Sequence, residues 1–443
     1  MKRTIICILV ATMLFLTGCS YTQTGIDALL QPPKLSKQQD EIFTALGISG
    51  KKELKLKYPR KGDYKSAFVI KNIDDEPTEE AIVFYEDTTA TEFPMRIVAL
   101  DQNKGRWEKA NQVGENASEV EKVSFISSDE KIYIIIGFTS LSKTEKFVRV
   151  YCYQNKQFQS VGEPLRCNSY EVFDMNGEGE DEVITMTMKK SDQEIQSITA
   201  TVHKISVNGL VSVSETPMDP NTTDFDNLYK GKINPTTPAL YVDGRKGTTK
   251  VTTEILVMNK GKLENLIYNA KSPKKSLIQK TERTVGSYCE DINDDGVYEI
   301  PRVVPALGFE NTEKHQTLSF IDWYNYEKGE LVPFKKSYVD YKLGYLYIIP
   351  PEWLKKVTLS YSSNDNEVFF YEYNSDNPNE NTKLASIKVM EKTEYLKDTE
   401  GVINNEYHIL KENGQLIYLY QLYPNSSELA LSKQSFEKGF VLL

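Results

Sequence analysis

The feature that most constrains the fold of this chain is a repeated unit made of a strand, a polar turn and a second strand. The centres of these turns are marked by Asp74, Ser128, Asn176 and Asn293. Successive markers lie roughly 50 residues apart, and the last interval is about twice as long, with a looser unit at 228–257 inside it. A period of this length is typical of a four-stranded antiparallel unit, so the sequence predicts a tandem array of small sheets.

Each unit continues into a hairpin whose turn resembles Asn-Lys-Gly and is followed by a bulky apolar residue. These hairpins are predicted at residues 103–107, 154–158, 208–210, 259–263 and 328–331. Short Asn/Gly turns between apolar runs are a strong hairpin signal. The 27 tyrosines and 18 phenylalanines also favour strands over helices. We therefore expect a mainly β protein.

The most regular turn places oxygen-bearing side chains at alternating positions. Asp291, Asn293, Asp295 and Glu299, together with the carbonyl of Val297, form a candidate calcium site. A second candidate consists of Asp174, Asn176, Glu178 and Glu182. The alternative for both turns is that Asp and Asn bond their own backbone and hold no ion. Calcium is the only cofactor that the sequence predicts.

These acidic turns resemble the FG-GAP and VCBS family of β-propeller repeats, in which a D-x-N-x-D-G turn precedes a strand. The turn at Asp291 matches well and the turn at Asp174 matches in part. A third turn, around Asp74, matches least, because Pro77 stands where the glycine should be. The resemblance implies a β-propeller of about five blades over residues 51–336. It implies a binding scaffold and no particular activity.

The N-terminus has the features of an export signal. Lys2 and Arg3 precede an apolar run at 5–15 that is too short to span a bilayer. The following residues, 16–19, resemble the lipobox of bacterial lipoproteins. This resemblance implies a signal peptide at 1–18 and a diacylglycerol, with acyl chains such as palmitate, on Cys19. The mature protein would then be anchored to the extracytoplasmic face of the cell membrane. The alternative is an ordinary secretory signal followed by a chance cysteine.

Charge and cysteine content narrow the possible partners. The chain carries 53 Lys and Arg residues against 63 Asp and Glu residues, for a net charge of −10. Such an acidic chain is not expected to bind nucleic acid. Cys152, Cys167 and Cys289 have no metal-ligand spacing and are predicted to be buried thiols, with a Cys152–Cys167 disulfide as the alternative.

Residues 19–50 are predicted to form a tether and then a short helix at 37–46 that begins after Ser36. The basic stretch at 51–61 is interpreted as an edge strand with solvated lysines. Its alternative is a patch that faces anionic lipid or wall polymer.

Residues 337–443 are predicted to form a separate, small α+β sandwich domain with a last helix at 427–438. Gly344, Tyr345, Pro350, Pro351 and Trp353 are similar to the opening of PsbP/Mog1-like α/β sandwiches. Two tyrosine- and phenylalanine-rich stretches, at 338–347 and 369–373, are expected to line sheet faces. Exposed, they would instead form a surface for sugars or a protein partner.

No catalytic constellation is recognisable. His203, His315 and His408 fall in separate regions, and the chain has no nucleophile elbow, phosphate-binding loop or dinucleotide motif. We therefore expect a lipid-anchored, non-enzymatic binding or assembly protein of the bacterial cell envelope, with a protein or glycan partner. The alternative is a carbohydrate-active hydrolase that uses carboxylates at the mouth of the propeller.

Overall fold

The structure, a computed structural model, describes residues 35–47 and 54–443 except 75, 144, 193, 313–316, 398 and 425. Cys19 and the proposed signal therefore lie outside the described residues. The chain is mainly β, as the sequence predicts. Its described residues form six antiparallel sheets, of which the first four follow one another along the sequence. Within the described ranges, no helix is both long and apolar enough to cross a membrane.

The first four sheets are built from consecutive strands. Sheet 1 contains β1 (Leu54–Leu56), β2 (Phe68–Lys71), β3 (Glu80–Asp87), β4 (Met95–Asn103) and β5 (Arg106–Glu115). Sheet 2 contains β6 (Ala117–Ser128), β7 (Lys131–Ser140), β8 (Lys146–Gln154) and β9 (Gln157–Cys167). Sheet 3 contains β10 (Ser169–Phe173), β11 (Glu182–Ser191), β12 (Glu194–Ser206) and β13 (Gly209–Met218). Sheet 4 contains β14 (Asp224–Asn234), β15 (Thr237–Lys246), β16 (Lys250–Asn259), β17 (Lys262–Asn265) and β18 (Arg283–Thr284).

The last two sheets are interleaved in sequence. Sheet 5 contains β19 (Ile300–Pro305), β20 (Ser319–Glu327), β21 (Glu330–Asp340), β22 (Tyr345–Ile348) and β28 (Phe440–Leu442). Sheet 6 contains β23 (Val357–Ser362), β24 (Glu367–Glu372), β25 (Thr382–Glu391), β26 (His408–Asn413) and β27 (Leu416–Leu422). Because β28 pairs with β22, sheet 6 is an insertion between two neighbouring strands of sheet 5.

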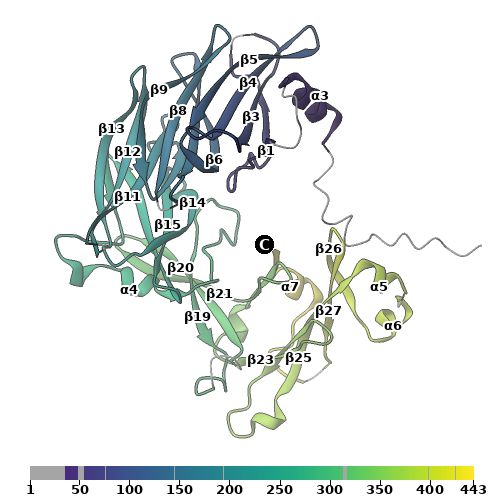
Figure 1. Cartoon of the computed structure of the whole chain (residues 1–443). Coiled ribbons are helices and arrows are strands. Elements are labelled where there is room, and N and C mark those ends of the chain that lie inside the picture. The colour runs from purple at the N-terminus through teal and green to yellow at the C-terminus, as the bar shows by residue number, and fades with distance from the viewer. Residues whose placement is uncertain are drawn as a thin grey trace, which may run out of the picture.

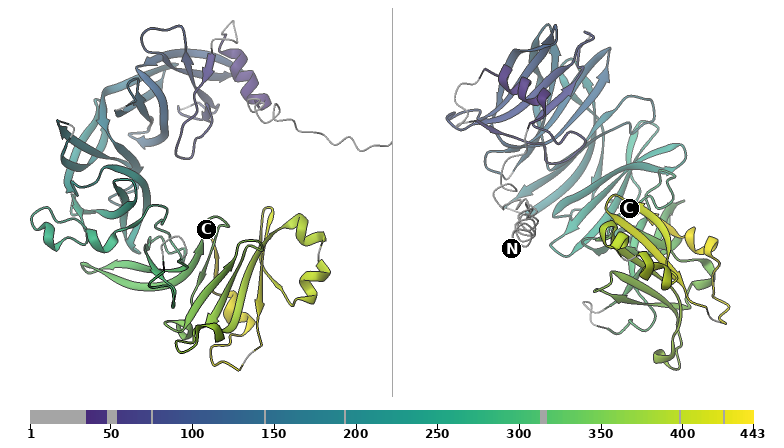
Figure 2. Two further views of the ribbon diagram at one scale, coloured as in Figure 1. Left: turned by 60° about the horizontal axis from the view of Figure 1, so that its bottom comes forward. Right: turned by 90° about the vertical axis from the view of Figure 1, so that its right-hand side faces the viewer.

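The sheets follow an open arc (Figures 1 and 2), with sheet 1 and sheet 6 at its two ends. The outer strands β5, β9, β13 and β17 contact one another in succession, which holds the first four sheets in order. The four-stranded units and the five predicted hairpins are therefore present. Closure into a five-bladed propeller is not confirmed.

One end of the arc is covered by a helix. The helix α3 (Lys37–Ala45) begins after Ser36, whose hydroxyl accepts a hydrogen bond from the N–H of Gln39, as the sequence predicts. Its buried residue Ile42 packs against the face of sheet 1 together with Leu46. This contact removes apolar surface that would otherwise be exposed at the end of the stack.

The C-terminal core lies between sheets 5 and 6. Tyr347 on β22 contacts the buried rings of Phe370, Trp353 and Phe436. Tyr345 on the same strand contacts the buried ring of Tyr418. This confirms the expectation that these aromatic residues line sheet faces. The predicted domain boundary at 336/337 falls inside β21.

The helical segments of the C-terminal half are short. The predicted last helix is shorter than expected, because α7 (Lys433–Glu437) begins only after Ser432 caps it. The remaining helices are α4 (Ile278–Thr281), α5 (Lys392–Lys397) and α6 (Thr399–Asn404), with 3₁₀ turns at Pro273–Lys275, Pro351–Trp353 and Pro378–Glu380.

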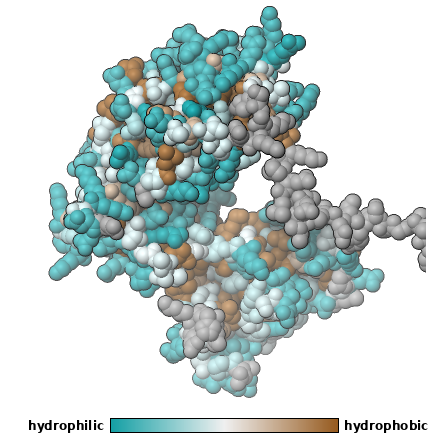
Figure 3. All heavy atoms as spheres, viewed as in Figure 1, coloured by the Kyte–Doolittle hydropathy of each residue, from teal (hydrophilic) through white to brown (hydrophobic). Residues whose placement is uncertain are grey.

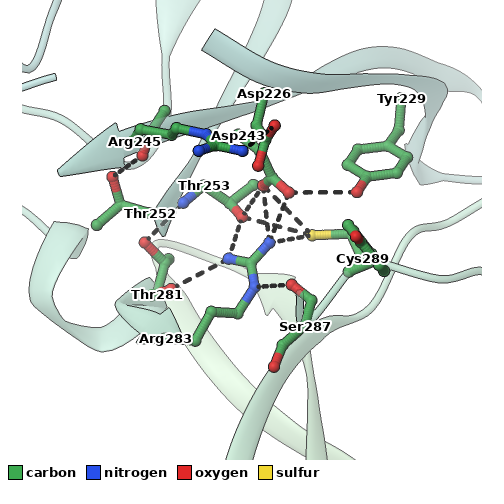
Figure 4. A network of polar contacts seen from close by, with 12 residues as sticks. Asp226, Tyr229, Asp243, Arg245, Thr252, Thr253, Thr281, Arg283, Ser287 and Cys289 are labelled. Atoms are coloured by element: carbon green, nitrogen blue, oxygen red, sulfur yellow. Dashed lines mark hydrogen bonds and ion pairs between the residues drawn. The ribbon is translucent and has the colours of Figure 1, made fainter. Parts of the chain in front are cut away.

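A buried ion pair fixes β18, the last strand of sheet 4, against β15 (Figure 4). The guanidinium of Arg283 donates to both carboxylate oxygens of Asp243, at 2.8 and 2.7 Å. Thr253 also donates to Asp243, and the thiol of Cys289 lies 3.4 Å from the guanidinium. Burial raises the pKa of Cys289 to about 12, which keeps the thiol protonated. Cys152 and Cys167 are likewise buried and free, which confirms the prediction of three buried thiols.

Candidate functional site

A concave cavity lies where early strands of four successive sheets meet. This concave cavity has a volume of about 630 Å³. Its walls come from the segment 60–65, from β2, β6, β10 and β14, and from Asp181. β6, β10 and β14 are each the first strand of their sheet, and β2 is the second strand of sheet 1. The cavity therefore draws its lining from the start of each of the first four sheets.

One wall of the cavity depends on a glycine. The ring of Tyr170 on β10 packs directly against Gly137 on β7, where an added Cβ would lie 2.3 Å from the ring. The hydroxyl of Tyr170 donates to the carbonyl oxygen of Lys122 at 3.0 Å. These two contacts fix β10 against sheet 2 and so set the position of Lys122 on β6.

The cavity is richer in positive charge than the protein as a whole. Its six basic residues are Arg60, Lys61, Lys65, Lys71, Lys122 and Lys230. Its four acidic residues are Asp63, Glu171, Asp181 and Asp226. This excess of two positive charges occurs in a chain whose net charge is −10. On the face shown in Figure 3, hydrophilic residues dominate the outside of the arc.

Part of this charge is already neutralised within the cavity. Lys122 and Lys230 both pair with Glu171. The Nζ of Lys61 donates to the backbone carbonyl of Asp226 at 3.4 Å. Asp181 differs from the other carboxylates, because burial raises its pKa above the usual value.

Besides Tyr170, two further aromatic rings interrupt the charged lining. Tyr64 and Phe125 meet edge to face with their ring centroids 5.0 Å apart. The ammonium of Lys71 lies 5.2 Å from the centroid of the Phe125 ring. The cavity therefore combines ammonium groups, carboxylates and apolar ring surface.

The predicted calcium turn at Asp291 folds on its own backbone. The carboxylate of Asp291 accepts from the N–H groups of Asp295 and Gly296, at 3.0 and 2.7 Å. Asp295 accepts from the N–H of Val297 and from the amide of Asn293. This is the pattern expected of a self-bonded acidic turn.

The second predicted turn has the same character. Asp174 accepts from the backbone N–H groups of Gly177 and Gly179, at 2.7 and 2.8 Å. The side-chain amide of Asn176 donates to Glu178 and Glu182. Lys204 also lies 3.4 Å from Glu178.

A buried glutamate closes all three acidic turns. Glu80, Glu182 and Glu299 are at most 1 % exposed. Their carboxylates accept from the backbone N–H groups of Ile73, Met175 and Ile292, at 2.7, 3.0 and 3.0 Å. Burial raises the pKa of Glu80 and of Glu299 to about 7.

The donor chemistry of the Asp291 turn suits calcium, but the geometry does not gather the donors around one point. Oε1 of Glu299 is buried and has no hydrogen-bond partner, so it is available as a ligand. Across the residues that the structure covers, however, no three His, Cys, Asp or Glu side chains are close enough together to hold a metal ion. Calcium at Asp291 or at Asp174 therefore stays a prediction.

The histidines do not form a site. His203 is buried, bonds Thr185 at 2.9 Å, and has a pKa lowered to about 4 by burial. His408 packs against the ring of Tyr420. His315 lies outside the described residues.

Sequence reasoning did not identify the residues that line the cavity. Tyr64, Phe125, Lys122 and Lys230 stand out only once the order of the sheets shows that these segments lie together. Their position in the repeat was readable, because each lies near the start of a predicted unit.

No protein-family model matches the sequence, and a search of curated proteins finds no match. Solved structures are similar only at a low level. A hypothetical selenium-binding protein from Sulfolobus tokodaii gives a TM-score of 0.31 at 10% identity, over 47% of this chain and 55% of that one. Two exo-beta-1,3-galactanases each give a TM-score of 0.27 at 10% identity. The match to the enzyme from Phanerochaete chrysosporium covers 76% of this chain and 79% of that enzyme. The match to the enzyme from Clostridium thermocellum covers 83% of this chain and 86% of that enzyme.

Proposed function

We propose that this protein is a lipid-anchored, extracytoplasmic binding protein that holds an anionic ligand of the cell envelope in the concave cavity. The observation that carries the proposal is the excess of basic side chains at the point where four sheets meet. The net charge of −10 would repel an anion from most of the surface. A cluster of ammonium groups in a concave wall reverses this effect locally and attracts the ligand to one place.

The lining also favours binding over chemistry. Glu171 is buried and is paired with two lysines, so its carboxylate serves to position the lining. Lys65 and Lys71 have no carboxylate partner within ion-pair distance among the described residues and can contact a ligand directly.

The binding test uses the mature chain and trigalacturonate as a short anionic probe. We expect Lys65→Glu and Lys71→Glu to weaken binding about fivefold or more in calorimetry, because each replaces an attraction with a repulsion. Lys190→Glu, an exposed lysine of β11 outside the cavity, makes the same change of charge and should leave the affinity unaltered. Equal affinities in all three variants would remove the cavity from the proposal.

A carbohydrate-active hydrolase is the second candidate function. One observation favours it: burial raises the pKa of Asp181 in the cavity wall, which is the property that a general acid needs. Release of reducing ends from envelope glycans by the wild type, lost in Asp181→Asn, would support the hydrolase. Persistence of that release in the variant would exclude Asp181 as the acid.

The lipid anchor is tested separately. We expect the wild type to take up labelled palmitate and to fractionate with membranes, because two acyl chains give stable anchoring. Cys19→Ser should lose both properties. The proposed anchor would be contradicted if the wild type took up no labelled lipid and the Cys19→Ser variant still fractionated with membranes.

A further inference from the structure

The concave cavity lies beside a second hollow with which it shares two lining residues. This neighbour has a volume of about 340 Å³ and is lined by Arg60, Lys61, Glu119, Glu121, Thr139, Lys143 and Lys146. Arg60 and Lys61 line both hollows, so they lie at the boundary between them. Ligand sites for small molecules have volumes of about 300–1,000 Å³, so each hollow alone reaches that size.

The second hollow continues the positive charge of the first. It has four basic residues and two acidic ones. Glu121 is engaged by Thr139 at 2.5 Å and by Lys146 at 3.4 Å. Lys143, in the turn between β7 and β8, is exposed and has no carboxylate within ion-pair distance among the described residues. Its ammonium can contact a ligand at the far end of the path, as that of Lys65 can within the concave cavity.

We propose that the ligand is an extended anionic glycan, which runs from the concave cavity across Arg60 and Lys61 into the second hollow. This inference rests on the proposed function, because it names the ligand class of the same cavity. A single small anion would fill only part of one hollow and would leave Lys143 without a role. A chain with repeating anionic groups places a negative charge at each successive cluster of ammonium groups.

The aromatic pair argues for sugar units between the charges. Tyr64 and Phe125 offer half-buried ring surface in the main cavity, against which the apolar face of a pyranose can stack. A polyanion without rings gains nothing from this surface. The anionic group is a carboxylate or a phosphodiester, and both satisfy the same lysines.

The first experiment measures the dependence of affinity on chain length. Oligogalacturonates supply the carboxylate arm, and glucosyl-phosphate oligomers of equal charge supply the phosphodiester arm. We expect affinity to rise at least tenfold from the disaccharide to the octasaccharide in one arm or both, and the tighter arm identifies the anionic group. Lys143→Glu should weaken the octasaccharide about fivefold and leave the disaccharide unchanged. Lys65→Glu should weaken the binding of both oligosaccharides, and Lys190→Glu should weaken the binding of neither.

The second experiment tests the role of the sugar ring. Tyr64→Leu should weaken the octasaccharide about fivefold but leave an inorganic polyphosphate of equal charge unaffected. Tyr64→Phe keeps the ring and should behave as the wild type. Melting temperatures of each variant establish that it is folded before binding is compared.

The outcomes separate this inference from the proposed function. If the disaccharide and the octasaccharide bind equally tightly and Lys143→Glu has no effect, the extended glycan is overturned. The proposal of a short anionic ligand in the concave cavity then still holds. Equal losses for polyphosphate and glycan in Tyr64→Leu would overturn the sugar stacking. Failure of every anionic probe to bind would overturn both the inference and the proposed function.

Discussion

At the scale of single residues, the acidic turns show what sequence can reveal and what it cannot. The alternation of Asp and Asn around Asn293 was visible, and so was Glu299 at the end of the turn. The burial of Glu299 was not visible in the sequence, because it depends on the following strand entering the core. Its contact with the N–H of Ile292 ties the start of the turn to its end.

The predicted calcium at Asp291 can be tested by chelation. We expect a chelator to lower the melting temperature of the wild type by a few degrees, because a bound ion stabilises only the folded state. Asp291→Ala should melt lower than the wild type in any buffer, because Asp295 and Gly296 lose their acceptor. It should show no further response to chelator. A wild-type melting temperature that is indifferent to chelator would remove the metal from the turn.

A second residue-scale prediction concerns Glu254. It is buried, and its carboxylate accepts from the amide of Asn265 and the N–H of Asp219. Burial raises its pKa to about 7. The folded state therefore holds this proton more tightly than the unfolded state does. The resulting stability is complete below the unfolded pKa of about 4.5 and is lost as the pH rises through about 7.

Glu254→Gln should therefore flatten the pH dependence of the unfolding free energy. The fall in this free energy from about pH 5 to about pH 8 should be smaller than in the wild type, by roughly 3 kcal/mol at most. Urea unfolding at both pH values measures this difference. The exposed Glu215→Gln serves as the control and should keep the wild-type dependence. An unchanged slope in Glu254→Gln would show that another group governs this range.

At the scale of elements, the hairpins were predictable because their turn residues act locally. The Asn-Lys-Gly sequences place residues such as Lys104 and Gly105 at positive φ, which a tight hairpin requires. The placement of β18 in sheet 4 was not predictable in this way. Its position depends on Arg283 reaching Asp243 across 40 residues of sequence. The lining of the cavity was missed for the same reason, because sheet order along the arc brings its residues together.

The buried pair gives a prediction at this scale. Arg283→Ala should lower the unfolding free energy by about 3–5 kcal/mol, because it leaves the carboxylate of Asp243 buried without its counter-ion. Lys250 and Glu282 join nearly the same two segments, but their side chains are 56% and 36% exposed. Lys250→Ala should therefore change stability by less than about 1 kcal/mol. Urea denaturation of both variants makes the comparison, and similar losses would contradict the importance of the buried pair.

At the scale of the whole molecule, the sequence predicted the repeating sheets but not their path. The repeat sets the number of strands in a unit, whereas closure depends on whether the end faces meet. The end face of sheet 1 is packed against α3, so its apolar surface is already covered without a neighbouring sheet. Local turn and strand patterns contain no such information.

The role of α3 as an end cover can be measured. Ile42 is fully buried against sheet 1, so Ile42→Ala should lower the unfolding free energy by about 2–5 kcal/mol. Hydrogen exchange should rise first in sheet 1, because each sheet depends mainly on its neighbours. Glu41→Ala, on the exposed side of the helix, is the control. Uniform acceleration of exchange over all six sheets would show that the arc unfolds as one unit.

The pairing of β28 with β22 has a consequence for biogenesis. Tyr345 pairs with Leu442, so β22 has both of its neighbours only once β28 is in place. A chain that lacks residues 440–442 would leave the backbone groups on one side of β22 unpaired. Sheet 5 therefore cannot be completed during synthesis before β28 has been made.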